Sequence, residues 1–273
     1  MNSLVSVIIP TRNSSKTLDK CLFSVNNQIY KNIEIVIVDQ ESEDDTLSIA
    51  KRYNCRIMSI QKPLFYTPPT KSRNVGARCA KGDILYHLDS DMELSERLIH
   101  EAVNIFTVKP EAGALIVHEV DITRGFWSKV KAFERRCYWG NDEIESARIV
   151  RRNIFETVGG YDEDISSGED FDIHRRYKKI TEIDFCKNIV FHNMGYLSFF
   201  KLISKKYSYG KTAKLYFQKQ RTSGSNLLKE QLGCYFKNYK QFFKHPILGA
   251  FSIFLKFCEF DSGFVGMIKK QIK

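Results

Sequence analysis

Residues 83–93 read Asp-Ile-Leu-Tyr-His-Leu-Asp-Ser-Asp-Met-Glu. The apolar run at residues 84–88 ends in Asp89-Ser90-Asp91, which places two carboxylates one residue apart. Ligands of open α/β sheets bind at the carboxyl ends of the strands. Carboxylate oxygens suit Mg²⁺ or Mn²⁺, and such an ion commonly bridges protein carboxylates to substrate phosphates. Although Asp-x-Asp is common in loops, its place after a strand predicts a divalent metal that holds a diphosphate.

Strand-like and helix-like segments alternate through the first half of the chain. We expect strands at residues 4–10, 33–39, 56–60 and 84–88. The helices expected between them begin near residue 14 and span residues 44–53 and 71–80. This alternation predicts a parallel, right-handed βαβ sheet that helices cover on both faces.

The pattern loosens beyond residue 95. We expect a helix at residues 96–108, a strand at 112–117, an aromatic and basic stretch at 124–140, a turn at 159–162 and a helix at 166–179. The remainder is helical in character and rich in aromatic residues and lysine. The predicted domains are therefore a catalytic α/β domain at 1–197 and a basic, aromatic-rich helical region at 198–273.

Composition and cysteine content limit the class of protein. The 273 residues, 43% hydrophobic and 27% charged, suffice for one large domain or one domain with an appendage. Seven scattered cysteines without a Cys-x-x-Cys pair indicate neither a zinc knuckle nor a disulfide framework, so a reducing compartment is expected. We find no signal-peptide pattern and no run of about 18–20 apolar residues, the length of a spanning helix. The expected location is cytoplasmic, peripheral on the cytoplasmic face of the cell membrane.

Positive charge is concentrated at the C-terminal end. Residues 201–273 hold 15 Lys/Arg and three Asp/Glu, a net charge of +12, whereas residues 1–200 have a net charge of −2. Lysines interleaved with aromatic residues are typical of a helix in a membrane interface, where each Lys/Arg contributes about 1 kcal/mol near an anionic surface. The alternatives are a helical cap with solvated lysines and a nucleic-acid surface. Because no nucleic-acid motif is present, we expect an anionic membrane surface as partner and no nucleic acid.

Polar residues follow the first, second and fourth expected strands, and others open the helix after the third strand. We expect them to form a pocket for a nucleotide diphosphate, with Asp39 accepting from a nucleobase or ribose and with Arg73 and backbone N–H groups facing phosphate. The candidate donor-binding residues are Pro10, Thr11, Arg12, Asn13, Asp39, Glu41, Lys71, Arg73, Asn74, Asp89, Ser90 and Asp91. The competing interpretations are that Asp39 caps its turn and that Arg73 is a surface cation.

These motifs resemble those of family 2 glycosyltransferases with the GT-A fold, over roughly residues 4–195. The resemblance rests on Val7-Ile8-Ile9-Pro10-Thr11-Arg12-Asn13, on Val38-Asp39 with Ser42 and Asp45-Thr46, on Arg73-Asn74-Val75-Gly76, on Asp89-Ser90-Asp91 and on Glu169-Asp170. It implies a GT-A-like, Rossmann-type mixed and mostly parallel sheet with a C-terminal helical extension. It also implies inverting transfer of a sugar (a hexosyltransferase type) from a nucleotide diphosphate-sugar, with Mn²⁺ or Mg²⁺.

The resemblance assigns roles to single residues. Asp39 would contact uracil or guanine, Asp89 the ribose or the metal, and Asp91 the metal on the diphosphate. Asp170 would be the general base, with Glu169 on the acceptor side; by position alone this pair would only stabilise a helix N-terminus. His192 and Glu93 are equal candidates for a further metal ligand. Trp127, in the aromatic stretch, is expected to cradle the acceptor.

The expected reaction is a single sugar transfer from a UDP- or GDP-linked donor to a glycan or polyprenyl-linked acceptor in surface glycan assembly. The Gln-x-x-Arg-Trp motif of processive synthases is absent; Arg175 and Arg176 stand near its place. Two alternatives remain: a polyprenyl-phosphate glycosyltransferase that makes a lipid sugar carrier, and a noncatalytic membrane protein that binds nucleotide sugars.

Overall fold

The computed structural model describes residues 3–61, 69–165, 167–219 and 223–269, and their contacts divide them into two compact units. Unit 1 takes its residues from 1–120, 146–163 and 173–193. Unit 2 takes its residues from 121–145, 164–172 and 194–273, so it contains the basic C-terminal region together with two earlier stretches. The domain boundary at residue 197 stays a prediction.

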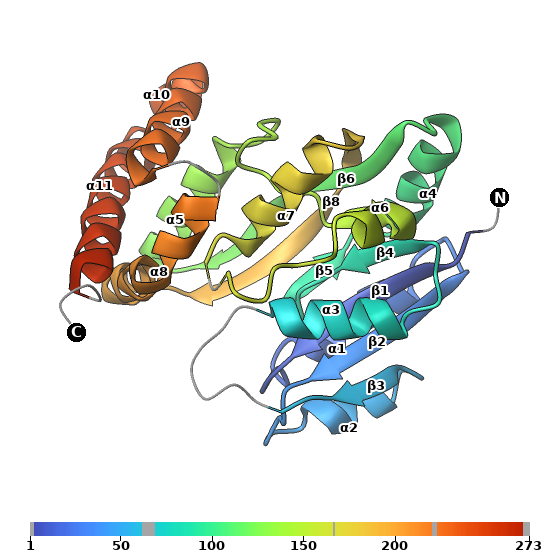
Figure 1. Cartoon of the computed structure of the whole chain (residues 1–273). Helices are drawn as coiled ribbons and strands as arrows, with labels where there is room; N and C mark the ends of the chain where they lie inside the picture. The colour runs from blue at the N-terminus through green and yellow to red at the C-terminus, as the bar shows by residue number, and fades with distance from the viewer. Residues whose placement is uncertain (1–2, 62–68, 166, 220–222, 270–273) are drawn as a thin grey trace. The chain divides into compact units, whose positions relative to one another are not determined.

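Unit 1 is built on a mixed sheet, shown in Figure 1. The strand order is β3-β2-β1-β4-β7-β6-β8-β5. Strands β1 to β4 pair in parallel, whereas β4 with β7, β6 with β7 and β5 with β8 are antiparallel. The strands are β1 (Val5–Thr11), β2 (Ile33–Asp39), β3 (Arg56–Ser59), β4 (Ile84–His87), β5 (Met92–Leu94), β6 (Ala112–Arg124), β7 (Ile149–Arg151) and β8 (Glu182–Tyr196).

Side-chain alternation along β1 gives the sheet two buried faces. Val7 and Ile9 lie in one hydrophobic cluster with buried residues of α1 and α4, and Ile8 lies in a second cluster with buried residues of α3 and α6. Because both faces are covered, β1 and β2 are apolar almost throughout rather than alternating. The helices of this unit are α1 (Leu18–Asn26), α2 (Thr46–Lys51), α3 (Thr70–Cys79), α4 (Leu98–Val108) and α6 (Arg152–Thr157). Helix α7 (Glu169–Lys178) has its first residues in unit 2 and the others in unit 1.

Gly76 sets how closely α3 approaches the sheet. A Cβ at this position would collide with the Ile8 side chain on β1, so glycine permits the contact. This helix carries Arg73 and Asn74, and its packing therefore fixes both side chains relative to the strand ends.

The sequence predictions for the first four strands and the helices between them are confirmed to within a few residues. The predicted GT-A-like mixed and mostly parallel sheet, flanked by helices and followed by a helical C-terminal region, is also confirmed. The strand expected at 112–117 continues to Arg124, and β5, β7 and β8 were not predicted. Helix α7 begins at Glu169, and Ser166 of its expected start lies outside the described residues.

Unit 2 is helical, with α5 (Phe126–Arg136), α8 (Phe199–Lys219), α9 (Gly224–Lys237), α10 (Tyr239–Lys244) and α11 (Pro246–Lys269). Helix α8 packs along α11, as Figure 1 shows, and a Cβ at Gly210 would collide with the backbone of Gly263. Two small hydrophobic clusters join α5 to the other helices. Among the described helices none is long and apolar enough to cross a membrane.

Candidate functional site

The site lies where the strand order of unit 1 reverses. From β1 the chain proceeds to β2 and β3 on one side, and then crosses to β4 on the other side. Such a switch point leaves a crevice at the carboxyl ends of the two central strands. Ser90, which follows β4, donates a hydrogen bond of 2.9 Å to Ser14 Oγ, which follows β1. The Asp-Ser-Asp motif is thereby attached to the loop after β1.

Asp39 ends β2 and is fully buried. Its carboxylate accepts from Thr11 Oγ1 at 2.8 Å and from the backbone N–H and Oγ of Ser42 at 2.8 and 2.6 Å. Asp39 therefore joins the ends of β1 and β2 and orders the turn that follows. Its expected contact with a nucleobase stays a prediction.

The loops after β1 and β2 support each other. Asn13 and Glu41 both have positive φ, 49° and 50°, a conformation uncommon for residues other than glycine. The backbone N–H of Asn13 donates to Ser42 Oγ, and its Oδ1 accepts from the N–H of Glu43, both at 2.8 Å. This arrangement fixes an unusual backbone where the loops after β1 and β2 meet. Pro10 is half-buried beside it, and Arg12 and Lys71 are exposed.

Asp89 is held by two arginines. Its Oδ1 accepts from Arg73 at 2.7 Å and its Oδ2 from Arg148 at 3.2 Å. Burial opposes ionisation of Asp89, but the charges of Arg148 and Arg73 outweigh it and hold the pKa of Asp89 well below its ordinary value. The Arg73 side chain is only 2% exposed, so the alternative that Arg73 is a surface cation is wrong. Its contact with phosphate stays a prediction.

Asn74 connects α3 to the glycine turn predicted at residues 159–162. Its Nδ2 donates to the carbonyl of Tyr161 and to Glu163 Oε1, and its Oδ1 accepts from the N–H of Tyr161, all at 2.9 Å. Gly160 has a φ of +71°, and a Cβ there would press on Asn74 Oδ1. The described contacts of Asn74 position this turn, and a contact with the donor stays a prediction.

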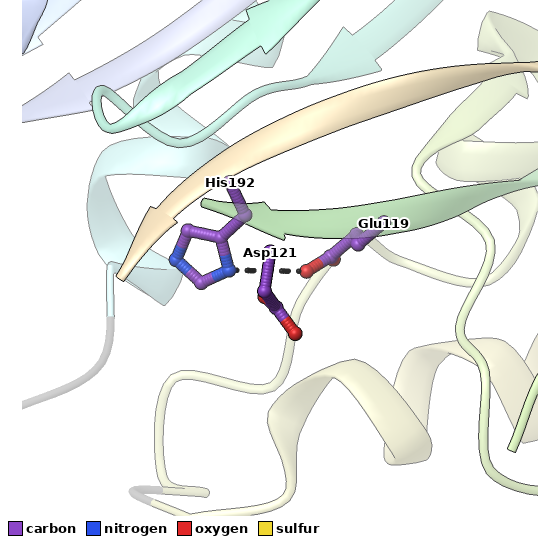
Figure 2. A group of neighbouring side chains, drawn as sticks. All are labelled: Glu119, Asp121 and His192. Atoms are coloured by element: carbon purple, nitrogen blue, oxygen red, sulfur yellow. Dashed lines mark ion pairs between the residues drawn. The ribbon is translucent and has the colours of Figure 1, made fainter. Parts of the chain in front are cut away.

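His192 lies beside Asp91 in unit 1. Its Nε2 is 3.4 Å from Asp91 Oδ2, and its Nδ1 is 3.3 Å from Glu119 Oε2. Figure 2 shows the ion pair between His192 on β8 and Glu119 on β6. One imidazole and two carboxylates are groups that bind Mn²⁺ or Mg²⁺. The Asp91 side chain is 41% exposed and is therefore accessible to a ligand.

The strand register separates the two candidates for the further metal ligand. His192 on β8 is opposite Met92 on β5, and Glu93 is opposite Phe191. Because opposite residues share a face and successive residues alternate, Glu93 leaves the other face of the sheet from His192. Of the two, His192 is the residue that the structure places beside Asp91.

Glu119 was missed by the sequence analysis, and so was its neighbour Asp121. The two residues are two positions apart on β6, so their side chains leave the same face of the strand (Figure 2). The Glu-Val-Asp spacing was the available signal, but the expected strand ended at residue 117. Asp121 pairs with Arg135 within unit 2 at 3.3 Å.

The predicted base and acceptor residues belong to unit 2. Glu169 and Asp170 form the first turn of α7, and both are half-buried. Trp127 lies in the first turn of α5, where its ring contacts Phe199 with 4.9 Å between centroids. Their roles stay predictions.

Two relatives whose names state an activity are similar in sequence to the chain. It is 34% identical over 156 residues to the Staphylococcus aureus poly(ribitol-phosphate) β-N-acetylglucosaminyltransferase TarP, a match covering 55% of the chain and 45% of TarP. It is 34% identical over 93 residues to the Campylobacter jejuni GalNAc(5)-diNAcBac-PP-undecaprenol β-1,3-glucosyltransferase, covering 33% of the chain and 30% of that enzyme. The chain thus matches less than half the length of either relative.

Solved glycosyltransferase structures share the fold. S. aureus TarS, residues 1–349, superposes with a TM-score of 0.62 at 16% identity, covering 99% of this chain and 92% of that one. The mannosyltransferase PcManGT from Pyrobaculum calidifontis, in complex with GDP-Man and Mn²⁺, gives 0.61 at 17% identity, covering 99% and 75%. The sequence profile described as glycosyl transferase family 2 matches residues 6–159, more than half of the chain. The chain therefore belongs to glycosyl transferase family 2.

Proposed function

We propose that this protein transfers a single sugar from a nucleotide diphosphate-sugar to a glycan or lipid-linked acceptor, with inversion at the anomeric carbon and with a divalent metal. The acceptor class is supported by the names of the two relatives, which specify a poly(ribitol-phosphate) and an undecaprenol diphosphate glycan. The observation that carries the proposal is the convergence of Asp39, Asp89 and Asp91 at the switch point of the sheet.

The donor pocket comprises the loops after β1, β2 and β4. Asp39 and the loop that it orders would receive the nucleoside, and Asp89 would face the ribose. The fixed backbone of Asn13 and Glu41 supports this assignment, because a preorganised site does not have to order its loops when the ligand binds. A bound UDP-GlcNAc in a TarS structure of the same fold agrees with a donor of this class.

Asp91 and His192 would hold the metal, with Glu119 orienting the imidazole. The fit rests on the donor set: Asp91 Oδ2 and His192 Nε2 lie 3.4 Å apart, and Glu119 binds the other ring nitrogen. A carboxylate on the second nitrogen of a metal-binding histidine is a common way of fixing the tautomer and the ring orientation. The metal would supply positive charge that neutralises the leaving diphosphate.

Asp170 would act as the general base. In a single displacement the acceptor hydroxyl attacks the anomeric carbon while the bond from that carbon to the diphosphate oxygen breaks. The hydroxyl proton passes to the Asp170 carboxylate, and the nucleoside diphosphate leaves with the bonding electron pair. A positioned base typically contributes about 10²–10⁴ in rate. Trp127 and Glu169 are assigned to the acceptor side.

Thermal stabilisation by nucleotides tests the donor site directly. Ligand binding to the folded state raises stability by about 2.7 kcal/mol at a concentration of 100 Kd. The wild type should be stabilised by UDP or GDP, more strongly with Mn²⁺, and Asp91→Ala should lose the metal-dependent part. Asp83→Ala is the matched control, because Asp83 is an exposed aspartate before the opposite end of β4. Equal stabilisation of Asp91→Ala and the wild type would refute the metal assignment.

The base assignment needs a separate experiment. Asp170→Asn should bind the nucleotide as the wild type does while sugar transfer falls by about 10²–10⁴. Asp164→Asn, the same substitution at an exposed residue of unit 2, should retain transfer. Near-normal transfer by Asp170→Asn would exclude Asp170 as the base and leave the donor site unaffected.

A further inference from the structure

Helix α11 is amphipathic, with its charged side facing the interior of unit 2. The residues that it buries include Ser252, Lys256 and Glu259, each 4% exposed or less. Its exposed large side chains are apolar and recur at helical spacing: Ile247, Phe251, Ile253, Phe254, Phe257, Phe264, Val265 and Ile268. A surface helix normally turns its apolar side inward. The outward side of α11 is therefore suited to an apolar environment that the described residues do not provide.

Aromatic rings extend this surface from α11 to α5 and α8. Phe251 contacts Phe126 and Trp127, with centroids 5.0 and 5.8 Å apart. Trp127 contacts Phe199, which in turn contacts Phe254 at 5.9 Å and Phe200 at 5.7 Å. We call these six residues of unit 2 the aromatic face: Phe126, Trp127, Phe199, Phe200, Phe251 and Phe254. Phe200 is 80% exposed and Phe254 is 52% exposed, so the face is open to solvent.

Exposed basic residues adjoin the aromatic face in sequence. Arg124 and Lys129 flank the start of α5, and Lys201 and Lys205 follow Phe200 on the first turns of α8. All four are exposed. Aromatic side chains surrounded by lysine and arginine suit the boundary of a bilayer, where rings enter the headgroup region and cations meet anionic lipid.

We propose that the aromatic face is a membrane-docking surface, which seats unit 2 on an anionic phospholipid bilayer with α11 parallel to the membrane plane. Helix α11 has 24 residues, so it would lie along about 36 Å of the surface. Charge argues against a second copy of the chain as occupant, because two apposed faces would bring their basic residues together. Asp261 is also exposed on α11, and its neighbour Ser262 donates to the carbonyl of Ile203 on α8, but this one aspartate is outnumbered by the four basic residues.

The test is vesicle binding by the full chain, which requires no nucleotide, metal or acceptor. Flotation would compare vesicles of phosphatidylcholine alone with vesicles that also contain phosphatidylglycerol. We expect binding to the anionic vesicles and its loss at about 1 M salt, where the Debye length is about 3 Å. Vesicle binding is measured independently of sugar transfer. A protein that does not bind vesicles would therefore leave the proposed function intact, and a protein that does not transfer sugar would leave this proposal intact.

Two double variants locate the contact. Phe251→Ser with Phe254→Ser should lower the affinity for anionic vesicles at least about tenfold, since it removes two apolar anchors. Lys201→Glu with Lys205→Glu should weaken binding at least about tenfold at low salt. Lys20→Glu with Lys51→Glu, at exposed positions of unit 1, makes the same change in net charge and should leave binding unchanged. If the phenylalanine variant fails to fold, the lysine variant still decides, because its residues are exposed.

Fluorescence reports whether the aromatic face enters the lipid. The chain has two tryptophans, and Trp139→Phe leaves Trp127 as the single reporter. Anionic vesicles with brominated acyl chains should quench Trp127. Absence of binding to anionic vesicles, or binding that both double variants retain, would overturn the proposal. The proposal would also be overturned if the protein did not bind vesicles but formed a dimer that the phenylalanine substitutions dissociate. The aromatic face would then be a protein interface.

Discussion

Asp89 and Asp91 lie in one three-residue motif, yet their surroundings predict different effects of substitution on stability. Asp89 accepts from Arg73 and Arg148, and the Arg73 side chain is 2% exposed. Asp91 has a side chain that is 41% exposed and pairs with His192. The substitutions Asp89→Asn and Asp91→Asn remove the same charge from the two positions. We expect the first to destabilise unit 1 and the second to leave its stability nearly unchanged.

The magnitude follows from burial. Removing one partner of a buried ion pair costs about 3–5 kcal/mol, whereas an exposed pair is worth about 0–1 kcal/mol. Asp89 has a 30% exposed side chain but neutralises a buried guanidinium, and asparagine keeps an acceptor oxygen. We therefore expect a loss of about 2–3 kcal/mol for Asp89→Asn, between the two limits, and less than about 0.5 kcal/mol for Asp91→Asn.

Urea unfolding of both variants, followed by far-UV circular dichroism, measures the difference in their free energies of unfolding. In a thermal scan, the unfolding midpoint of unit 1 should fall by about 5–10 °C for Asp89→Asn. Stabilisation by Mn²⁺ with nucleotide should be lost in Asp91→Asn, although that variant is as stable as the wild type without ligand. Equal stability of the two variants would refute the inference that Asp89 holds Arg73 in place.

Two further predictions concern buried polar contacts. Glu134 accepts from Lys131 and Lys256, so Glu134→Gln should cost about 3–5 kcal/mol by urea unfolding. Burial opposes its ionisation, but the two lysines outweigh burial and hold the pKa of Glu134 below its ordinary value. This stabilisation is therefore fully present above about pH 4.5 and lost as the pH falls further, so the variant and the wild type should converge in acid. If their difference persisted unchanged at pH 3, the ion pairs would not be its source. Separately, Asn74→Ala should cost about 1–3 kcal/mol and speed hydrogen exchange at the Tyr161 amide, whose acceptor it removes; unchanged exchange would contradict the positioning role of Asn74.

The elements that could be predicted from the sequence are those whose pattern lies within a short stretch of neighbouring residues. Strands β1, β2 and β4 are short apolar runs, and helices separate the first four strands, a pattern that periodicity detects. The strand ends carried their own signals, since Asp39 and Asp89 directly follow apolar runs and Asp91 stands two residues after Asp89. The placement of these residues at the carboxyl ends of neighbouring strands therefore followed from the sequence order, and the donor pocket itself stays a prediction.

The remainder depends on pairings between distant segments. Strands β5 and β7 have three residues each, too few for a period to show. Arg148 reaches Asp89 across 59 positions, and Glu119 reaches His192 across 73, so neither contact has a local signature. His192 and Glu93 were equal by sequence, and the β5–β8 register and the contact of His192 with Asp91 are visible only in the structure.

The buried ion pairs of unit 2 and the aromatic face are two consequences of one orientation of α11. Lys256 and Glu259 can turn inward because Lys131 and Glu134 on α5 neutralise them, which leaves the apolar side outward. Glu134→Gln removes a negative charge from this cluster and weakens the contacts that hold α11 in this orientation. We therefore expect the folded fraction of Glu134→Gln to bind anionic vesicles several-fold more weakly, although Glu134 is buried. Glu101→Gln, at a glutamate that accepts backbone hydrogen bonds within unit 1, should bind as the wild type does. Undiminished vesicle binding by folded Glu134→Gln would show that the aromatic face keeps its arrangement without the ion pairs.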